Sequence, residues 1–240
     1  MVRQALILAG GRGTRLGALT DGCPKPILSV GGRPFLAYLL GLLARQGVRN
    51  VILSTGYHAE SIRHAFPGGT VNGLEIQHSV ETTPMGTGGA ILLARPLLQD
   101  TFLVLNGDTL FDHDAQVLNK LLLSRSGALG AIALREIDDA GRYGCVRLDH
   151  AVIRAFAEKS TSGRGVINGG VYCLKQAALD GLPFRPCSIE RDIFPHLIEQ
   201  GKLLGQVFAG YFIDIGIPET LARAQTELPD WERKQAIASS

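Results

Sequence analysis

The sequence predicts an α/β protein built around one doubly wound, mixed β-sheet. Apolar runs bounded by turn residues alternate with helical patterns along the first half of the chain, and this alternation is typical of parallel strands joined by right-handed crossovers. The 240 residues suit a single hydrophobic core, because cores stop growing near roughly 250–300 residues. In addition, 45% of the residues are hydrophobic and only 19% are charged, which excludes intrinsic disorder.

Four apolar runs in the first half are expected to be the buried strands of the parallel part. They are Ala5–Ala9, Asn50–Ser54, Leu74–His78 and Phe102–Leu105. Helices are expected between these runs, over Pro34–Gln46, His58–Phe66 and Thr87–Leu98. The first is expected to end before Gly47, because glycine is typical of the position after a helix. Because ligands bind beyond the carboxyl ends of the strands in such sheets, the loops that follow these strands are the candidate site.

The second half of the chain has a different rhythm, which predicts a mixed extension of the sheet. Helices are expected over Ala115–Ser124, Ile189–Gln200 and Pro218–Leu228. Strands are expected over Leu129–Leu134, Cys145–Leu148, Val152–Glu158, Val166–Leu174 and Leu204–Phe208, and a further apolar run covers Tyr211–Ile215. Since no repeat or linker is present, we expect one domain over residues 1–228 and a tail over 229–240. The tail either docks as a short helix around Trp231 or frays.

Charge and cysteine content exclude several classes of partner. The chain has 24 Lys and Arg against 22 Asp and Glu, a net charge of +2. This charge is too small to attract nucleic acid or an anionic membrane surface. Any anion must therefore bind locally. The four cysteines lack zinc-ligand spacing and are expected to be free thiols in a reducing cytoplasm. The first apolar run is too short for a signal peptide or a membrane span.

A glycine-rich loop follows the first strand and predicts a phosphate-binding site. The strand runs into Gly10-Gly11-Arg12-Gly13-Thr14-Arg15, and Lys25 follows between two prolines. Glycines allow consecutive backbone N–H groups to point into one concavity, and Arg15 and Lys25 add positive charge for a triphosphate. For the glycine cluster alone, a tight turn with solvated cations is the alternative. The patterns of P-loop ATPases and of dinucleotide oxidoreductases are both absent.

Two aspartates in apolar surroundings predict a Mg²⁺ site. Asp108 follows a buried run and a glycine, and Asp214 interrupts the apolar run Phe212–Gly216. Because Mg²⁺ binds one or two protein carboxylates and takes its other ligands from water and phosphates, these two residues meet its needs. Taken singly, an aspartate after a strand is more often a helix cap, and this is the role expected of the nearby Asp112 and Asp114.

The loop after the third strand carries Glu81, which is expected to lie near the nucleotide. A carboxylate only accepts hydrogen bonds, and guanine offers two adjacent donors at N1 and N2. Uracil and thymine offer a single donor between two carbonyl oxygens. Charge therefore favours guanine. On composition alone, Glu81 is about equally well explained as an ordinary solvated loop residue.

These motifs resemble those of the sugar-1-phosphate nucleotidyltransferases, and the likeness covers nearly the whole chain. It rests on Leu8–Leu16 with Pro24–Pro26, on Asn106-Gly107-Asp108 and on Asp214-Ile215-Gly216. Three further phrases are most similar to the guanylyltransferases that act on a heptose 1-phosphate: Arg142–Gly144, Ile167–Tyr172 and Tyr211–Glu219. One departure is Ala18-Leu19-Thr20, where many hexose enzymes have Pro-Leu-Thr, and it weakens a hexose assignment.

The resemblance implies a Rossmann-like, GT-A-like fold of the nucleotide-diphospho-sugar transferase type, with roles for particular residues. Catalysis is expected to use Arg15, Lys25 and Asp108. The residues expected to bind the nucleotide are Ala9, Gly10, Gly11, Gly13, Thr14, Arg15, Lys25, Glu81, Gly86 and Thr87. The residues expected to bind the sugar are Tyr143, Gly144, Glu158, Lys159 and Asn168, and those expected to bind the metal are Asp108 and Asp214.

The implied reaction joins a nucleoside triphosphate, GTP by the charge argument, to a sugar 1-phosphate with Mg²⁺ and releases pyrophosphate. The product would be a sugar nucleotide for cell-surface polysaccharide, and a heptose 1-phosphate is the expected acceptor. One alternative is a uridylyl- or other nucleotidyltransferase acting on a hexose or N-acetylmuramic acid 1-phosphate. The other is a non-catalytic nucleotide-sugar sensor, which would not need Asp214. We expect a stand-alone catalyst without a fused second activity, and a homo-oligomer stays open.

Overall fold

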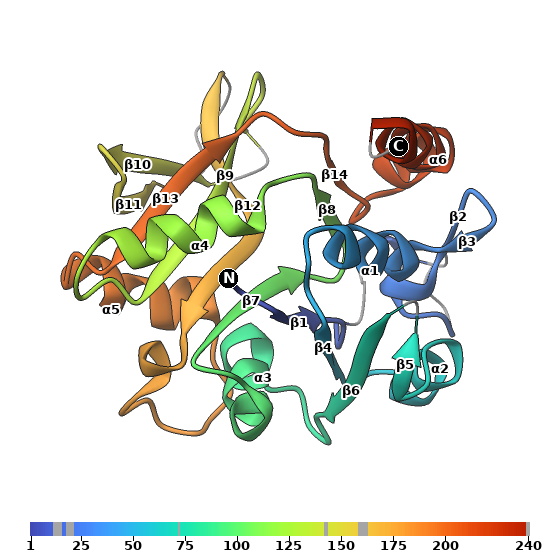
Figure 1. The fold of residues 1–240 in the computed structure, drawn as a ribbon, viewed down its shortest axis with the longest axis horizontal. Helices are drawn as coiled ribbons and strands as arrows, with labels where there is room; N and C mark the ends of the chain where they lie inside the picture. Colours follow the sequence, from blue (N-terminus) through green and yellow to red (C-terminus); the bar gives the residue numbers. More distant parts are fainter. Residues whose placement is uncertain (12–15, 18–21, 72, 142–143, 158–162, 239–240) are drawn as a thin grey trace.

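One ten-stranded sheet organises the part of the chain that the computed structural model describes, namely residues 1–11, 16–17, 22–71, 73–141, 144–157 and 163–238 (Figure 1). The strand order is β10-β11-β13-β9-β12-β7-β1-β4-β6-β5. At its centre lie β7 (Thr101–Asn106), β1 (Gln4–Leu8), β4 (Asn50–Thr55) and β6 (Leu74–Val80), which pair in parallel. The four strands expected in the first half are thus confirmed, and their carboxyl ends share one edge of the sheet.

The second half of the chain extends this sheet with strands of both directions, as expected. These strands are β9 (Gly130–Ile137), β10 (Cys145–Asp149), β11 (Val152–Ala157), β12 (Gly165–Lys175) and β13 (Leu203–Phe208). The antiparallel strand β12 lies between β7 and β9, and β13 pairs in parallel with β9. Because β12 is the direct neighbour of β7, it borders the carboxyl edge where the site was expected.

Several short strands were not anticipated from the sequence. They are β5 (Gly69–Val71) at the sheet edge, the pair β2 (Ser29–Val30) and β3 (Arg33–Pro34), and β8 (Thr109–Phe111), which pairs with β14 (Phe212–Asp214) inside the expected run Tyr211–Ile215. Runs of two or three residues carry no readable alternation. The β8–β14 pair matters most for the site, because it joins the chain after β7 to a segment about a hundred residues later.

The helices follow the predicted positions with altered ends. They are α1 (Phe35–Arg45), α2 (Ala59–Ala65), α3 (Gly86–Ala94), α4 (Ala115–Ser124), α5 (Phe194–Glu199) and α6 (Pro218–Ala238). Short 3-10 turns are η2 (Lys25–Ile27), η3 (Arg95–Leu97) and η4 (Gln176–Leu179), and the π-helical turn η5 (Ile189–Ile193) precedes α5. Helix α1 ends as expected, since Gly47 adopts a φ of 83°, a conformation that glycine accepts at helix ends.

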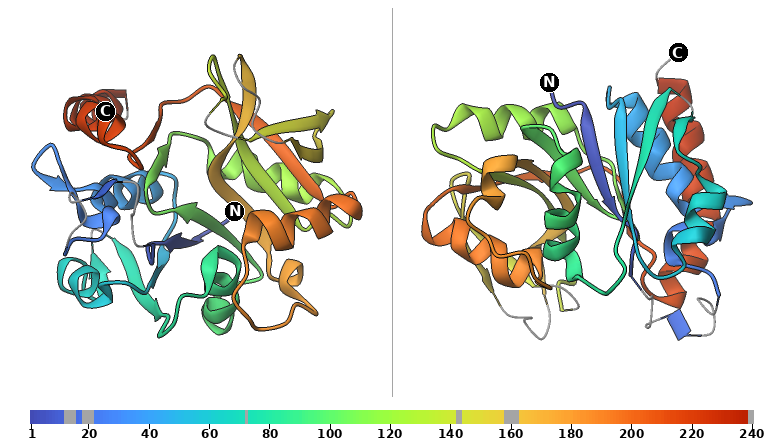
Figure 2. Two further views of the ribbon diagram at one scale, coloured as in Figure 1. Left: turned by 180° about the vertical axis from the view of Figure 1, so that it is seen from behind. Right: turned by 90° about the horizontal axis from the view of Figure 1, so that it is seen from below.

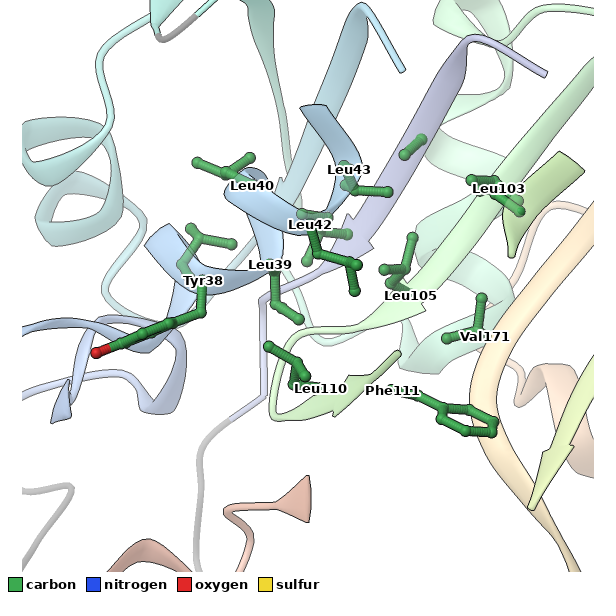
Figure 3. Packing of buried hydrophobic residues seen from close by; sticks show 14 of the residues in the cluster. Tyr38, Leu39, Leu40, Leu42, Leu43, Leu103, Leu105, Leu110, Phe111 and Val171 are labelled. Atoms are coloured by element: carbon green, nitrogen blue, oxygen red, sulfur yellow. The ribbon is translucent and has the colours of Figure 1, made fainter. Parts of the chain in front are cut away.

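The hydrophobic core lies on both faces of the sheet, as a doubly wound fold requires. Along β1, Ala5 and Ile7 belong to one cluster and Leu6 to the other, because successive side chains of a strand point to opposite faces. The first cluster takes its helical residues mainly from α1, α4 and α6, and the second from α3 and α5. Figure 3 shows leucines of α1 facing Leu103 and Leu105 of β7.

The expected helix end at Leu228 is wrong, because α6 continues through Pro229 to Ala238 (Figure 2). Trp231 on this extension is only 6% exposed, and its Nε1 donates a hydrogen bond of 3.1 Å to Oδ2 of Asp112. The Nε2 of Gln235 donates to the same oxygen at 3.0 Å. Of the two alternatives for the tail, docking is therefore the correct one up to Ala238.

Only one of the two aspartates expected to cap a helix does so. Asp114 caps α4, because its Oδ1 accepts from the N–H groups of Gln116 and Val117 at 2.8 and 3.0 Å. The side chain of Asp112 instead accepts hydrogen bonds from Trp231 and Gln235 of α6. None of the helices in the described ranges combines the length and the apolar content needed to cross a membrane.

Candidate active site

A cavity of about 620 Å³ opens at the carboxyl edge of the parallel strands. It is lined by the loops after β1, β4, β6 and β7, together with residues of η2, β12 and η5. Eight of the residues expected from the sequence to form the site line this cavity: Ala9, Gly10, Gly11, Lys25, Glu81, Gly86, Thr87 and Asp108. The fold therefore brings the motifs of the first half of the chain into one site.

The start of the glycine-rich loop is packed closely against its neighbours. The backbone N–H of Ala9 donates to the carbonyl oxygen of Ser54 at 2.8 Å. A Cβ atom on Gly10 would collide with Oε1 of Glu81 and lie 3.2 Å from the backbone nitrogen of Gly56, so a larger residue here would displace the carboxylate of Glu81. The expected phosphate-binding residues Gly13, Thr14 and Arg15 lie outside the described residues, and their roles stay predictions.

Lys25 and Asp108 form an ion pair in the cavity wall. The Nζ of Lys25 lies 3.2 Å from Oδ2 of Asp108, and the two side chains are 10% and 31% exposed. An ammonium group buried to this extent is costly without a partner, and Asp108 supplies one. The pair joins the turn η2 to the end of β7 and leaves a positive and a negative group side by side on the cavity wall.

The two expected metal ligands lie on neighbouring backbone segments. Strands β8 and β14 pair antiparallel with Thr109 opposite Asp214, and the N–H of Ile215 donates to the carbonyl oxygen of Asp108 at 2.9 Å. Oδ1 of Asp214 accepts from the N–H of Gly216 at 2.7 Å. Asp108 lines the cavity, whereas Asp214 is not part of its lining. Within the described ranges, no three His, Cys, Asp or Glu side chains form a metal-binding group.

Glu81 is held at the junction of three loops. Its backbone N–H donates to the carbonyl oxygen of Thr55 at 2.8 Å, and its Oε2 accepts from the N–H of Met85 at 2.7 Å. A Cβ on Gly56 would lie 2.7 Å from Cγ of Glu81. Burial raises the pKa of Glu81, and the hydrogen bond from Met85 opposes this shift. Glu81 is therefore half-buried with a specific partner, unlike an ordinary solvated loop residue.

The loop that follows Glu81 is tied to the segment before η5. Gly86 has a φ of 69°, and a Cβ there would lie 2.6 Å from the carbonyl oxygen of Cys187. That carbonyl accepts from the N–H of Gly88 at 2.9 Å, and Oγ1 of Thr87 accepts from the N–H of Ile189 at 2.9 Å. The expected nucleotide-binding residues Gly86 and Thr87 thus hold η5 against the cavity.

The expected sugar-binding residues have a mixed outcome. Asn168 and Gly144 are described, but neither is part of the cavity lining. The Nδ2 of Asn168 donates to Oη of Tyr172 and to Oε1 of Glu190, both at 3.0 Å, and its Oδ1 accepts from the N–H of Gly170 at 2.9 Å. Tyr143, Glu158 and Lys159 lie outside the described residues. The sugar-binding roles of all five expected residues stay predictions.

Among the lining residues to which the sequence assigned no role are Tyr57, Tyr172 and Glu190. Tyr57 follows β4, the side chain of Tyr172 is fully buried beneath the cavity, and Glu190 is exposed on η5. A single glutamate within an expected helix gives no signal of a site. Only the strand register, which places β12 beside β7, could have pointed to Tyr172.

The fold and this site define a nucleotide-processing enzyme, and comparison with known proteins gives the family. A family model described as nucleotidyl transferase matches residues 4–230. The chain therefore belongs to the nucleotidyl transferase family, and the family resemblance seen in the sequence is confirmed.

The more similar relatives are guanylyltransferases. The chain is 38% identical to the D-glycero-α-D-manno-heptose 1-phosphate guanylyltransferase of Aneurinibacillus thermoaerophilus, an alignment that covers 94% of this chain and 98% of that protein. It is also 38% identical to the mannose-1-phosphate guanylyltransferase of Mycobacterium tuberculosis, over 94% of this chain but 64% of that protein. The structure of HddC from Yersinia pseudotuberculosis complexed with GMP-PN matches with a TM-score of 0.80 and 35% identity, over 93% of this chain and 98% of that one.

Proposed function

We propose that this protein transfers the guanylyl group of GTP to D-glycero-α-D-manno-heptose 1-phosphate, forming a GDP-sugar and pyrophosphate. The observation that carries the proposal is the cavity in which Gly10 and Gly11, at the start of the glycine-rich loop, lie with Lys25, Asp108 and Glu81. Support for the acceptor comes from the heptose 1-phosphate guanylyltransferases, which are 36–38% identical to this chain over nearly their whole length.

Catalysis in this reaction is mostly a matter of position and charge. The phosphate oxygen of a sugar 1-phosphate is already an anion at neutral pH, so the attack on the α-phosphorus of GTP needs no general base. The protein holds the two phosphate groups in line and stabilises the charge that moves to the departing pyrophosphate. Lys25 would contribute a fixed positive charge to the triphosphate, since its ammonium group already faces the cavity beside Asp108.

Asp108 and Asp214 would hold a Mg²⁺ ion. Their donor set fits this ion, because Mg²⁺ is bound through one or two carboxylates with water and substrate phosphates completing its shell. The ammonium group of Lys25, 3.2 Å from Oδ2 of Asp108, shows that positive charge is accommodated at this carboxylate. When bound, Mg²⁺ would polarise the α-phosphate. The residues of this chain would orient both phosphates toward each other.

The proposed base and compartment rest on two further observations. Glu81 is half-buried at the cavity wall, where a carboxylate suits the two adjacent donors of guanine. A reducing cytoplasm fits the four cysteines, which are all free thiols.

The test is a matrix of nucleotides and acceptors with purified protein. GTP, UTP and dTTP would each be combined with the heptose 1-phosphate and with mannose 1-phosphate, with and without Mg²⁺. We expect pyrophosphate release and a GDP-sugar with GTP and the heptose 1-phosphate, and no product without Mg²⁺. More UDP-sugar than GDP-sugar would overturn the base, and no turnover with any pair would overturn the transferase activity in favour of a sensor.

A further inference from the structure

A polar network ends at Glu190, a residue to which no role has been assigned. Oε1 of Glu190 accepts from Nδ2 of Asn168 at 3.0 Å and from Oη of Tyr172 at 3.4 Å. The amide of Asn168 is itself oriented, because its Oδ1 accepts from the N–H of Gly170. Among the described residues, Oε2 of Glu190 has no partner and no Lys, Arg or His forms a salt bridge with this carboxylate. One oxygen is thus fixed, while the side chain remains exposed at the cavity.

The sheet order indicates which substrate this carboxylate faces. The strands run in the order β12-β7-β1-β4-β6. The base-binding loop and the glycine-rich loop follow β6 and β1, Asp108 follows β7, and Tyr172 lies on β12 beyond it. The acceptor attacks the α-phosphorus from the side opposite the nucleoside. If the base lies at the loop after β6, the acceptor therefore lies beyond Asp108, toward β12. Glu190 lines this end of the cavity with Tyr172.

We propose that Glu190 selects an uncharged, hydroxyl-rich acceptor: its carboxylate accepts hydrogen bonds from sugar hydroxyls and rejects sugars that carry a second acidic group. This inference rests on the proposed function and specifies its substrate class. A carboxylate is a strong acceptor for hydroxyl donors and cannot donate to another carboxylate or to a phosphate. An acidic substituent beside Glu190 would also meet a like charge, since no described Lys, Arg or His forms a salt bridge with this carboxylate.

The test compares two acceptors that differ by one charge. Mannose 1-phosphate and mannuronic acid 1-phosphate have the same ring configuration, but the second carries a carboxylate at C6. For wild type and Glu190→Gln, kcat and KM would be measured for each acceptor, for the heptose 1-phosphate and for GTP. Glu199→Gln is the matched control, because Glu199 is an exposed glutamate on the adjacent α5 and is not part of the cavity lining.

We expect Glu190→Gln to raise KM for the neutral acceptors by about tenfold, since a charge-assisted hydrogen bond becomes a neutral one, and to leave KM for GTP within about twofold. The ratio of kcat/KM between the neutral and the acidic acceptor should fall by about tenfold or more. If this ratio in Glu190→Gln equals that of wild type and of Glu199→Gln, the inference is overturned. Turnover by wild type in the same assays would still support the proposed function. Absence of both turnover and calorimetric binding of every acceptor by wild type would overturn the proposed function itself.

Discussion

Lys25 and Asp108 form an ion pair in the cavity wall although they are far apart in the sequence. Lys25 is buried to 8% exposure on η2, and its nearest acid, Asp108, comes from a strand end more than eighty residues later. Because a buried ammonium group is costly when unpaired, the pair contributes to stability as well as to the site. A phosphate that enters the cavity can replace the carboxylate of Asp108 as the partner of Lys25, because phosphate and carboxylate are both anionic hydrogen-bond acceptors.

The two aspartates are expected to be needed for turnover. Asp108→Asn and Asp214→Asn keep the side-chain shape but remove a negative charge, so each should lower kcat by about 100-fold or more. The measurement is pyrophosphate release at a series of Mg²⁺ concentrations, with circular dichroism to verify the fold. Asp138→Asn is the control, because Asp138 is exposed and is not part of the cavity lining. Wild-type turnover of either variant at limiting Mg²⁺ would contradict the metal assignment.

Glu81 has a structural contact in addition to its proposed role in base recognition. Glu81→Gln keeps an oxygen that can accept from the N–H of Met85, so the loop should persist. An amide cannot accept from both N1–H and N2–H of guanine, and the loss should reduce the preference for GTP over UTP by about 1–3 kcal/mol, roughly 5- to 150-fold.

Competition between the two triphosphates at equal concentration, followed by chromatographic separation of the products, measures this preference for wild type and variant. Base recognition predicts a changed product ratio. A purely structural role would lower the yields of both sugar nucleotides equally and leave their ratio unchanged.

At the scale of elements, α6 joins parts of the chain that are distant in sequence. Its Trp231 stacks on Tyr211 with ring centroids 6.1 Å apart, and the guanidinium group of Arg45 lies 5.1 Å from the indole centroid. Near the β2–β3 hairpin, Gln225 accepts from the N–H of Gly31 at 3.0 Å. Proline normally interrupts a helix because it lacks the N–H, but here the packing of the extension outweighs that loss.

Removal of the indole should therefore destabilise the whole protein. We expect Trp231→Ala to lower the free energy of unfolding by about 3–5 kcal/mol, as for other large buried side chains. Ile237→Ala on the same helix should change it by less than about 0.5 kcal/mol, because Ile237 is 77% exposed. Urea unfolding is followed by circular dichroism, because Trp231 is the only tryptophan and its removal leaves no tryptophan fluorescence to measure. Equal stability of the two variants would contradict the docking of α6.

At the scale of the whole molecule, one buried histidine couples stability to pH. His113 is 5% exposed, and its Nδ1 lies 2.8 Å from the carbonyl oxygen of Phe111. Its Nε2 is buried without a hydrogen-bond partner among the described residues. Burial lowers the pKa of His113 below its ordinary value of 6.5, although the Phe111 carbonyl and nearby carboxylates oppose the shift. The folded state therefore favours the neutral ring.

The sign of the pH effect follows from this shift. Above pH 6.5 both states hold a neutral ring; below it, the unfolded chain binds a proton that the folded chain does not. We expect the free energy of unfolding to fall as pH decreases from 6.5, by up to about 1.4 kcal/mol per pH unit from this residue. In His113→Asn the fall between pH 6.5 and 5 should be smaller than in wild type and in His64→Asn, whose histidine is exposed. Parallel pH curves for wild type and His113→Asn would contradict the assignment.

Much of the fold was predictable because its signals are local. The alternation of apolar runs and helical patterns predicted the four parallel strands, and the glycine at position 47 predicted the end of α1. The end of α6 was mispredicted for a physical reason: Pro229 indicates a break when read alone, and only its packing against the β2–β3 hairpin makes a continuous helix favourable.

The sequence by itself determined the fold class and identified eight residues that line the cavity, most of them in loops that follow a strand whose own apolar pattern reveals it. Only the tertiary structure decided that Tyr172 and Glu190 also line this cavity. Tyr172 and Glu190 reach the cavity through the insertion of β12 beside β7 and the contact of η5 with the loop at Thr87. Strand pairing and helix docking depend on contacts between residues far apart in sequence, and a local pattern carries no information about which distant segment will complete them.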